Sequence, residues 1–166
     1  MAHTGLQLRS LITPEGKLRL SLEEVETPAP GADEVVVRID AAPINPSDLA
    51  LLFGPADMRS AEVGGSAERP VVTADVPEKL LDMVAGRIGE SMAVGNEGAG
   101  VVVEAGSSDA AQALLGKVVA VAGGEMFSQY RCVNVFMAMP MAEGTTAKEA
   151  ASSFVNPMTA LGMVET

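Results

Sequence analysis

The chain contains one cysteine, Cys132, and one histidine, His3, so it is poor in the residue types that most often act as nucleophiles or metal ligands. A common zinc site needs three or four Cys and His side chains, and these two residues cannot supply them. Cys132 has no evident histidine or metal partner, so we expect an inert thiol in a strand. We expect His3 to lie in a frayed N-terminal segment, where it has no catalytic role. The residue types exclude a self-contained zinc enzyme of the ordinary kind.

Three glycines, Gly95, Gly98 and Gly100, form the pattern G-x-x-G-x-G. This differs from the G-x-G-x-x-G fingerprint of dinucleotide sites, and a β-branched run follows it where that fingerprint requires a helix. We therefore interpret the glycines as a tight corner that permits close backbone approach, in preference to a phosphate-binding loop.

Length and charge narrow the function classes further. The chain has 166 residues and a net charge of −11, which suits one packed domain whose surface repels nucleic acid and anionic membranes. It has neither a long apolar run nor an apolar N-terminal signal segment. We therefore predict a cytoplasmic protein with no nucleic-acid or membrane partner.

Five segments have the composition and periodicity of strands. Leucines alternate with polar residues in the first, and the others are rich in β-branched residues and bounded by glycine or proline. The segments are residues 17–25, 34–41, 100–106, 117–124 and 127–136. The only tyrosine, Tyr130, lies in the last and is interpreted as a half-buried sheet residue in preference to a catalytic acid.

Four shorter segments have helical signals. Asn45 and Pro46 can begin a helix, with Asp48 facing its positive end, and Thr146 with Glu149 form a capping box. Residues 77–89 have apolar side chains at helical spacing, and a further helix is predicted to begin at Asn156 after a break in the chain. The order of elements predicts a mainly β (α+β) domain, a small barrel with short peripheral helices, in which residues 55–94 form a surface excursion or lobe.

Four segments, residues 41–52, 94–107, 116–132 and 154–165, resemble in order and spacing the medium-chain dehydrogenase/reductase superfamily. The resemblance extends from about residue 18 to the end and is nearest to the zinc-independent quinone oxidoreductase and enoyl reductase branch. It implies an N-terminal catalytic domain with a GroES-like, partly open β-barrel over residues 1–166. It also implies that the chain ends where the nucleotide-binding Rossmann domain would begin, so that this domain is absent from the chain.

The resemblance also indicates what is missing. Zinc-dependent members place Cys, His and Cys ligands at the positions of Asn45, Asn96 and Val155, and no metal site is therefore expected. Enoyl thioester reductases carry a tyrosine at the position of Ala56, which counts against a thioester substrate. Without metal, hydride transfer from a nicotinamide requires orientation, a dry pocket and donors aimed at the oxygen where negative charge develops.

The resemblance implies that Asn45, Ser47 and Asn96 are catalytic and that Asn45, Asn156 and Thr159 bind the cofactor. Asn45 would contact the nicotinamide or the substrate carbonyl, or would only cap a helix. Ser47 matches the proton-relay position of zinc-dependent relatives, or is a solvent-facing first-turn serine.

The remaining positions carry alternatives too. Asn96 would line the cleft beneath the nicotinamide or satisfy turn backbone, and for Glu97 a pairing with a nearby cation is preferred over a role in that cleft. Thr159 would touch the nicotinamide ring or bond back to the carbonyl four residues earlier, and Asn156 would serve the site or cap its helix.

The resulting hypothesis is the catalytic-domain portion of an NAD(P)H-dependent reductase acting on quinones or α,β-unsaturated carbonyls. Its partners would be the missing Rossmann domain and a small-molecule acceptor, with a possible homo-oligomer through the exposed apolar face. NADPH or NADH is expected in the full-length protein and none on this fragment, which should be inactive alone. One alternative is a GroES-like binding or assembly module without catalysis. A weaker one is a zinc-type alcohol dehydrogenase with atypical ligands.

Overall fold

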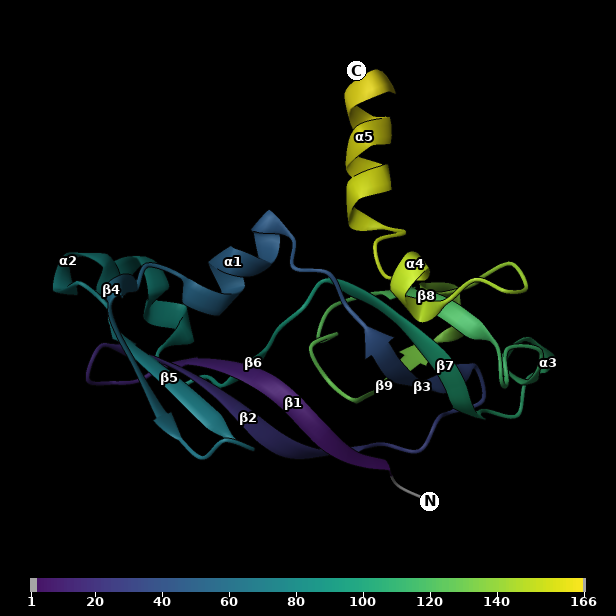
Figure 1. Cartoon of the computed structure of the whole chain (residues 1–166), viewed down its shortest axis with the longest axis horizontal. Helices are drawn as coiled ribbons and strands as arrows, with labels where there is room; N and C mark the ends of the chain where they lie inside the picture. Colours follow the sequence, from purple (N-terminus) through teal and green to yellow (C-terminus); the bar gives the residue numbers. More distant parts are fainter. Residues whose placement is uncertain (1–2, 166) are drawn as a thin grey trace.

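The computed structural model describes residues 3–165 and arranges their strands in two five-stranded antiparallel sheets (Figure 1). The first sheet has the order β4-β5-β2-β1-β6 and consists of β1 (His3–Ile12), β2 (Lys17–Thr27), β4 (Asp57–Gly65), β5 (Pro70–Asp75) and β6 (Met92–Ala93). The second has the order β10-β8-β7-β3-β9 and consists of β3 (Glu34–Ala41), β7 (Glu97–Ala105), β8 (Val118–Ala122), β9 (Tyr130–Asn134) and β10 (Ala138–Pro140).

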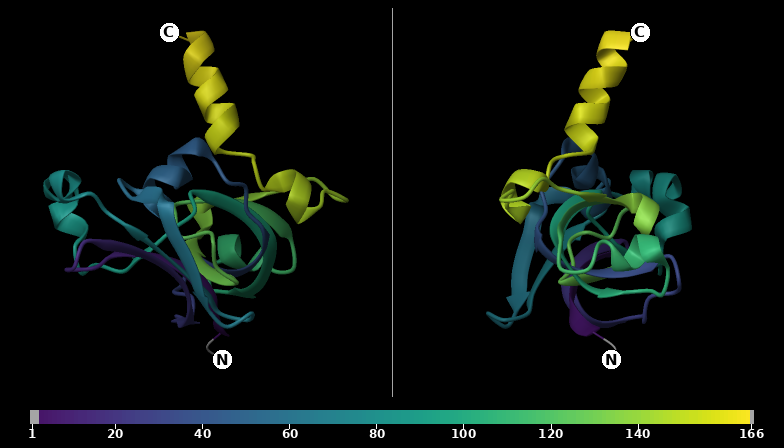
Figure 2. Two further views of the ribbon diagram at one scale, coloured as in Figure 1. Left: turned by 60° about the vertical axis from the view of Figure 1, so that its left-hand side comes forward. Right: turned by 90° about the vertical axis from the view of Figure 1, so that its right-hand side faces the viewer.

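The two sheets meet where β1 passes the segment that leads into β9. The Leu8 amide donates to the Phe127 carbonyl at 2.8 Å, and the Gln129 amide donates to the Leu6 carbonyl at 2.9 Å. These bonds join the sheets into a partly open barrel with helices at its periphery (Figure 2). The predicted mainly β architecture is confirmed.

Each sheet has its own apolar core. Val35, Val36 and Val37 are fully buried because β3 lies inside the second sheet, between β7 and β9. The core of the first sheet contains Ile12 and Leu18. A third cluster consists of small residues that hold the helix α4 against β7 and β8, namely Ala99, Ala120, Ala150 and Ala151.

The helices are short except for the last. They are α1 (Pro46–Phe53), α2 (Glu78–Leu81), α3 (Asp109–Gln112), α4 (Ala147–Ala150) and α5 (Val155–Glu165), with 3₁₀ segments η1 (Asp82–Arg87) and η2 (Val135–Met137). The predicted start of α1 after Asn45 and the capping box at Thr146 are confirmed. Hydrogen bonds from the backbone and side chain of Thr146 lower the pKa of Glu149. Among residues 3–165, no helix has the length and apolarity needed to cross a membrane.

Several elements differ from the sequence-based prediction. His3 is the first residue of a ten-residue strand, β1, whereas the prediction placed it in a frayed terminus and gave no strand there. Gln7 and Ser10 occupy buried positions of β1, so the strand lacks a clear apolar alternation. Residues 55–94, expected as a surface excursion or lobe, contain three strands of the first sheet, β4, β5 and β6, which were not predicted. Strand β4 is almost wholly exposed, so it has no apolar pattern to detect.

Two helix predictions also need correction. The helix expected over residues 77–89 is a single α-turn followed by a 3₁₀ segment that breaks at Val84, where φ is −119° and ψ is 17°. The last helix begins at Val155 and not at Asn156, so Asn156 lies inside the first turn. Asn156 is therefore not a cap.

The predicted close backbone approach at the glycines is confirmed. Gly95 has φ +98°, and a Cβ atom there would lie 2.6 Å from the Phe127 nitrogen. A Cβ atom at Gly100 would overlap the carbonyl of Arg38 on the neighbouring strand β3. These glycines let β7 and its entry loop pack directly on backbone.

Replacing Gly100 with alanine should therefore force β7 away from β3. We expect Gly100→Ala to lower the free energy of unfolding by about 1–3 kcal/mol, the usual cost of overpacking. Gly64→Ala is the matched control, because nothing lies within 4 Å of the Cβ atom that it adds. The control should change stability by less than about 0.5 kcal/mol. Equal urea midpoints for the two variants would contradict the close approach.

Candidate functional site

A buried hydrogen bond links the start of α1 to the start of β7. Asn45, the residue before α1, is 2% exposed, and its side-chain Nδ2 donates to Oε1 of Glu97 at 3.0 Å. Glu97 is the first residue of β7 and is 0% exposed. The Asn45 side-chain amide is therefore oriented by a carboxylate from a segment 52 residues away in the sequence.

The second oxygen of Glu97 binds the start of α5. Its Oε2 accepts from the backbone amides of Phe154 at 2.8 Å and Val155 at 3.0 Å. A carboxylate at a helix N-terminus is stabilised by unpaired amides and by the helix dipole. The predicted pairing of Glu97 with a cation is wrong: within residues 3–165, its oxygens are satisfied by three N–H donors and by no lysine or arginine.

A second buried carboxylate, Asp48, ties α1 to the loop before β7. Asp48 is 0% exposed, and its Oδ2 accepts from the backbone N–H of Asn45 at 2.8 Å. Its Oδ1 accepts from the backbone N–H of Asn96 at 2.9 Å. The first contact lies in the first turn of α1, where Asn45 was predicted as the cap and Asp48 as a charge facing the helix dipole. The second contact joins segments that lie 48 residues apart.

Ser47 and Asn96 form the more accessible part of this cluster. The Asn96 side-chain Nδ2 donates to Ser47 Oγ at 2.9 Å, and Ser47 is exposed. Because the Ser47 oxygen acts as acceptor in this bond, its hydroxyl proton is available to another acceptor. The three residues predicted to be catalytic, Asn45, Ser47 and Asn96, therefore lie together.

The positions that the family resemblance assigns to zinc ligands also converge here. Asn45 and Val155 are both bound by Glu97, and Asn96 is its neighbour in the chain. Two amides and a valine offer no thiolate or imidazole, so these residues do not fit the catalytic zinc of metal-dependent relatives. Within residues 3–165, no group of three or more His, Cys, Asp or Glu side chains is placed to hold a metal ion.

The two further residues predicted to bind cofactor lie on α5. Asn156 follows Val155 directly and is exposed, so it lies at the edge of the cluster. Thr159 Oγ1 donates to the Val155 carbonyl at 2.7 Å, the back-bonded arrangement that is common for threonine in helices. Thr159 is exposed one turn beyond the cluster, and within residues 3–165 its side chain forms no hydrogen bond with Asn45 or Asn96.

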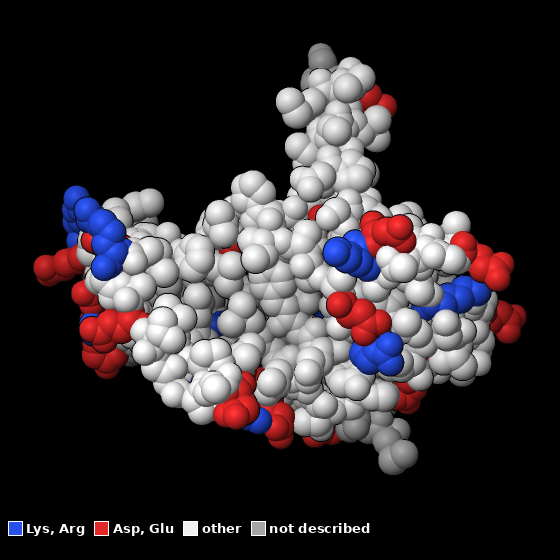
Figure 3. All heavy atoms as spheres, in the orientation of Figure 1, with Lys and Arg blue, Asp and Glu red and all other residues white. Residues whose placement is uncertain are grey.

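Helix α5 projects from the body and buries none of its described residues (Figure 1). Its start lies beside the start of α1 (Figure 2). Large apolar side chains remain exposed on both helices and beside them, namely Ile44, Leu49, Met158, Leu161, Met163 and Val164. In Figure 3, α5 and the surface between it and α1 are largely uncharged, whereas charged side chains gather at both ends of the body, along its lower edge and to the right of the base of α5.

Sequence reasoning gave Glu97 the wrong partner and missed the second role of Asp48. A signal for Glu97 exists, since it is the one charged residue in a run of glycine, alanine and valine that leads into a buried strand. A carboxylate in such a run is expected to be buried and hydrogen-bonded. The partners of Glu97 could not be predicted, because they come from segments 52 and 57 residues away.

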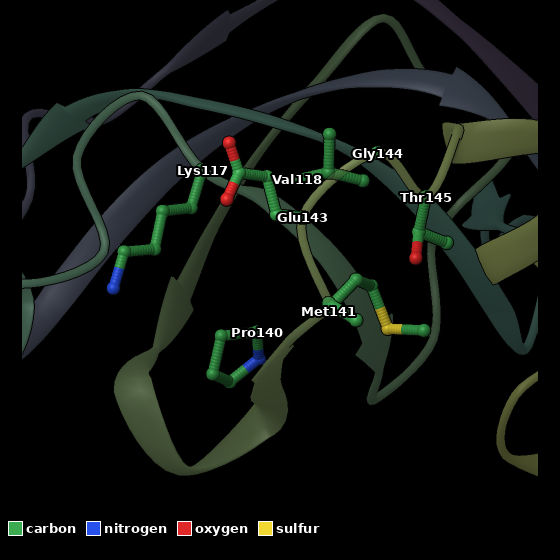
Figure 4. A pocket seen from close by; sticks show the side chains of 8 residues that line it. Lys117, Val118, Pro140, Met141, Glu143, Gly144 and Thr145 are labelled. Carbon is green, nitrogen blue, oxygen red and sulfur yellow. The ribbon is translucent and has the colours of Figure 1, made fainter.

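A separate surface pocket of about 420 Å³ lies between the start of β8 and the turn after β10 (Figure 4). Lys117, Met141 and Glu143 are among the residues that line it. It is at the opposite end of β8 from the cluster, because Val118 pairs with Val101, whereas Glu97 pairs with Ala122. The pocket is not part of the candidate site.

The histidine, the tyrosine and the cysteine lie together elsewhere. His3 Nε2 lies 3.2 Å from Glu104 Oε2, and its ring stacks on Tyr130 with centroids 5.0 Å apart. Tyr130 is half-buried in β9, as predicted. Burial, with a further contribution from nearby Glu34, raises the pKa of Cys132 to about 11, which agrees with an inert thiol.

This pKa predicts slow alkylation of Cys132. At pH 8 a pKa of about 11 leaves about a hundredfold less thiolate than the ordinary value of 9.0. The rate with iodoacetamide should be lower than that of a small cysteine peptide by about this factor, and should rise about tenfold for each pH unit up to pH 10. Circular dichroism checks that the chain stays folded. A rate that is half-maximal near pH 9 and levels off by about pH 10 would show an unperturbed thiol.

No protein-family profile and no curated protein sequence matches the chain. Solved structures do match its fold. A Mesorhizobium loti protein assigned as an NADPH:quinone reductase has a TM-score of 0.63 and 23% identity, over 98% of this chain and 43% of its own. CurK enoyl reductase has a TM-score of 0.63 and 18% identity, over 94% and 41%. A mycobacterial protein complexed with NADPH has a TM-score of 0.59 and 16% identity, over 98% and 40%.

These similarities define the fold. The chain has a GroES-like, partly open β-barrel fold, which it shares with solved structures described as quinone oxidoreductases and enoyl reductases. The chain spans about two fifths of the length of the neighbours described above.

The Glu97 carboxylate should be essential to the geometry of the cluster. Glu97→Gln replaces one acceptor oxygen by a donor that faces N–H groups, and we expect a loss of about 2 kcal/mol in the free energy of unfolding. Amide exchange at Phe154 and Val155 should accelerate. Glu62→Gln, at an exposed position of β4, is the control and should change neither quantity. Unchanged exchange at both amides in Glu97→Gln would contradict the assigned contacts.

Proposed function

We propose that this chain is the catalytic-domain portion of a zinc-independent, NAD(P)H-dependent oxidoreductase that reduces quinones or the activated C=C bond of α,β-unsaturated carbonyls. The observation that carries the proposal is the convergence of Asn45 and the start of α5 on Glu97, with Asn96 held in the same cluster by Asp48. The positions that the resemblance assigns to zinc ligands are Asn45, Asn96 and Val155. Here they are held together by hydrogen bonds to two buried carboxylates, those of Glu97 and Asp48. Several solved neighbours of the same fold are described as quinone oxidoreductases or enoyl reductases, which supports the class.

A nicotinamide bound at this site would supply a hydride to the acceptor. The contribution of the chain is to provide neutral donors for the acceptor oxygen, on which negative charge develops. The Ser47 hydroxyl is exposed and has its proton available, and Asn96 holds its oxygen in place. Asn45 has a second amide proton besides the one given to Glu97, and this proton is the donor that we assign to the nicotinamide or the substrate carbonyl.

The carboxylates of Glu97 and Asp48 keep these donors in one orientation. Glu97 accepts from the side-chain NH₂ group of Asn45 and so fixes the orientation of that amide. Asp48 accepts from the backbone N–H groups of Asn45 and Asn96 and so fixes the backbone at both residues. A preorganised donor does not need to reorient as the transition state forms, so it stabilises the developing charge more than a mobile one would. Asn156 and Thr159 are assigned to cofactor contact from α5.

The proposed enzyme requires a second domain that binds the dinucleotide. The G-x-x-G-x-G segment is used for close backbone packing, so the chain offers no dinucleotide fingerprint for the pyrophosphate. We assign NADPH or NADH binding to a Rossmann domain that would cover the uncharged face around α1 and α5. The exposed apolar residues of this face suit such a partner, and in its absence they favour self-association. The chain alone should be inactive.

A second candidate function is a binding or assembly module of the same fold without catalysis. It is favoured by the burial of Asn45, which is only 2% exposed and already hydrogen-bonded to Glu97. In that case Asn45 would serve the structure alone. The two functions differ in what the loss of the Asn45 amide does to turnover.

The test follows nicotinamide absorbance in the full-length protein with quinone and enone acceptors. Asn45→Ala should reduce kcat/KM by about a hundredfold, the usual effect of removing a donor to a developing oxyanion. Asn134→Ala is the matched control, because Asn134 caps η2 through its side chain at a site remote from α1. It should lower stability by about 1 kcal/mol and leave turnover unchanged. Equal turnover in the two variants would favour the module.

A further inference from the structure

A cation packs against the opposite end of α1 from the candidate site. Arg87, the last residue of η1, donates from Nη2 to the Leu51 carbonyl at 3.1 Å and to Ser10 Oγ at 3.1 Å. Ser10 is 0% exposed and donates its own proton to the Leu52 carbonyl at 3.1 Å. The last turn of α1 is thus bound by a side chain of η1 and a side chain of β1.

The charge of Arg87 is directed at the helix end and not at a carboxylate. Four other arginines, Arg38, Arg59, Arg69 and Arg131, pair with an acidic side chain, whereas within residues 3–165 Arg87 forms no such pair. Its Nε is buried without an acceptor, and burial lowers the pKa of the guanidinium. This placement costs desolvation energy, which the partial negative charge of the α1 carbonyls offsets.

The helix end is shaped for this contact. Gly54 ends α1 with φ +53°, and a Cβ atom added there would lie 3.2 Å from Nη1 of Arg87. A side chain at this position would therefore press on the guanidinium. Because Gly54 has no side chain, the guanidinium of Arg87 can lie against the last turn of α1.

We propose that Arg87 is a positioning residue, which holds the eight-residue helix α1 from its C-terminal end so that Asn45 and Ser47 keep their place at its N-terminal end. The helix has only eight residues, so apart from the packing of Leu52 in the first core its orientation depends on the polar contacts at its two ends. Asp48 and Glu97 supply one end, and Arg87 with Ser10 supplies the other. For turnover, this inference rests on the function proposed above.

Hydrogen exchange in the 166-residue chain tests the positioning without any assay of activity. Arg87→Met keeps the aliphatic stem but removes the donors and should accelerate exchange of the α1 amides, including that of Asp48, by about tenfold. Arg87→Lys should restore part of the protection. Arg69→Met removes an exposed cation that pairs with Glu24 and should leave α1 unchanged. Uniform acceleration across β3 and β7, or no change at Asp48, would overturn the proposal.

Turnover in the full-length protein gives the second readout. Arg87→Met should lower kcat about tenfold with little change in KM, because the donors remain present but are less well placed. A loss confined to KM would overturn the positioning role. If Asn45→Ala leaves turnover unchanged while Arg87→Met still loosens the start of α1, the proposed reaction fails and the mechanical role of Arg87 stands.

Discussion

The buried carboxylate of Glu97 is the constraint around which the candidate site is built. A carboxylate removed from water is costly unless donors replace the lost solvent, and here three N–H groups do so. These groups come from the residue before α1, from the residue before α5 and from the first residue of α5. One side chain on β7 therefore ties together the starts of two helices, which carry Ser47, Asn156 and Thr159, while Asn45 directly precedes α1 and Asn96 directly precedes β7.

The sheets make this arrangement rigid. Glu97 is placed by β7, which pairs with both β3 and β8, and glycines at its start allow the backbones of neighbouring segments to approach closely. The small-residue cluster of Ala99, Ala120, Ala150 and Ala151 fixes α4, which leads directly into α5. Backbone packing in the barrel is thus transmitted to the hydrogen bonds of the site. The exposed face beside α1 and α5 supplies the uncharged surface that a second domain would cover.

Local sequence signals were sufficient for four strands of the second sheet, β3, β7, β8 and β9, and for the starts of α1 and α4. The β-branched runs around Val36, Val102 and Val119 predicted strands because both of their faces are buried. Asn45 with Pro46, and Thr146 with Glu149, predicted helix starts because capping depends on residues three or four apart. The first strand was missed because Gln7 and Ser10 fill buried positions in it.

The site was predicted only in part, because local sequence patterns do not show contacts between distant segments. Asn45, Ser47 and Asn96 were proposed from their types and from a resemblance, and the structure brings them together, while their assigned chemistry stays a prediction. Glu97 and Arg87 act through contacts with segments 36 or more residues away, which no local pattern encodes. The topology of the fold determines which distant groups meet a buried charge. The sequence predicted a mainly β barrel but not the order of its strands.

A double-mutant cycle on Asn45 and Glu97 tests the central claim most directly. The free energies of unfolding of Asn45→Ala, Glu97→Gln and the double variant give the coupling between the two side chains. If the amide and the carboxylate form the bond at 3.0 Å, the coupling should be about 1–2 kcal/mol. Effects that add to within about 0.3 kcal/mol would show that the two residues act independently and would contradict the account.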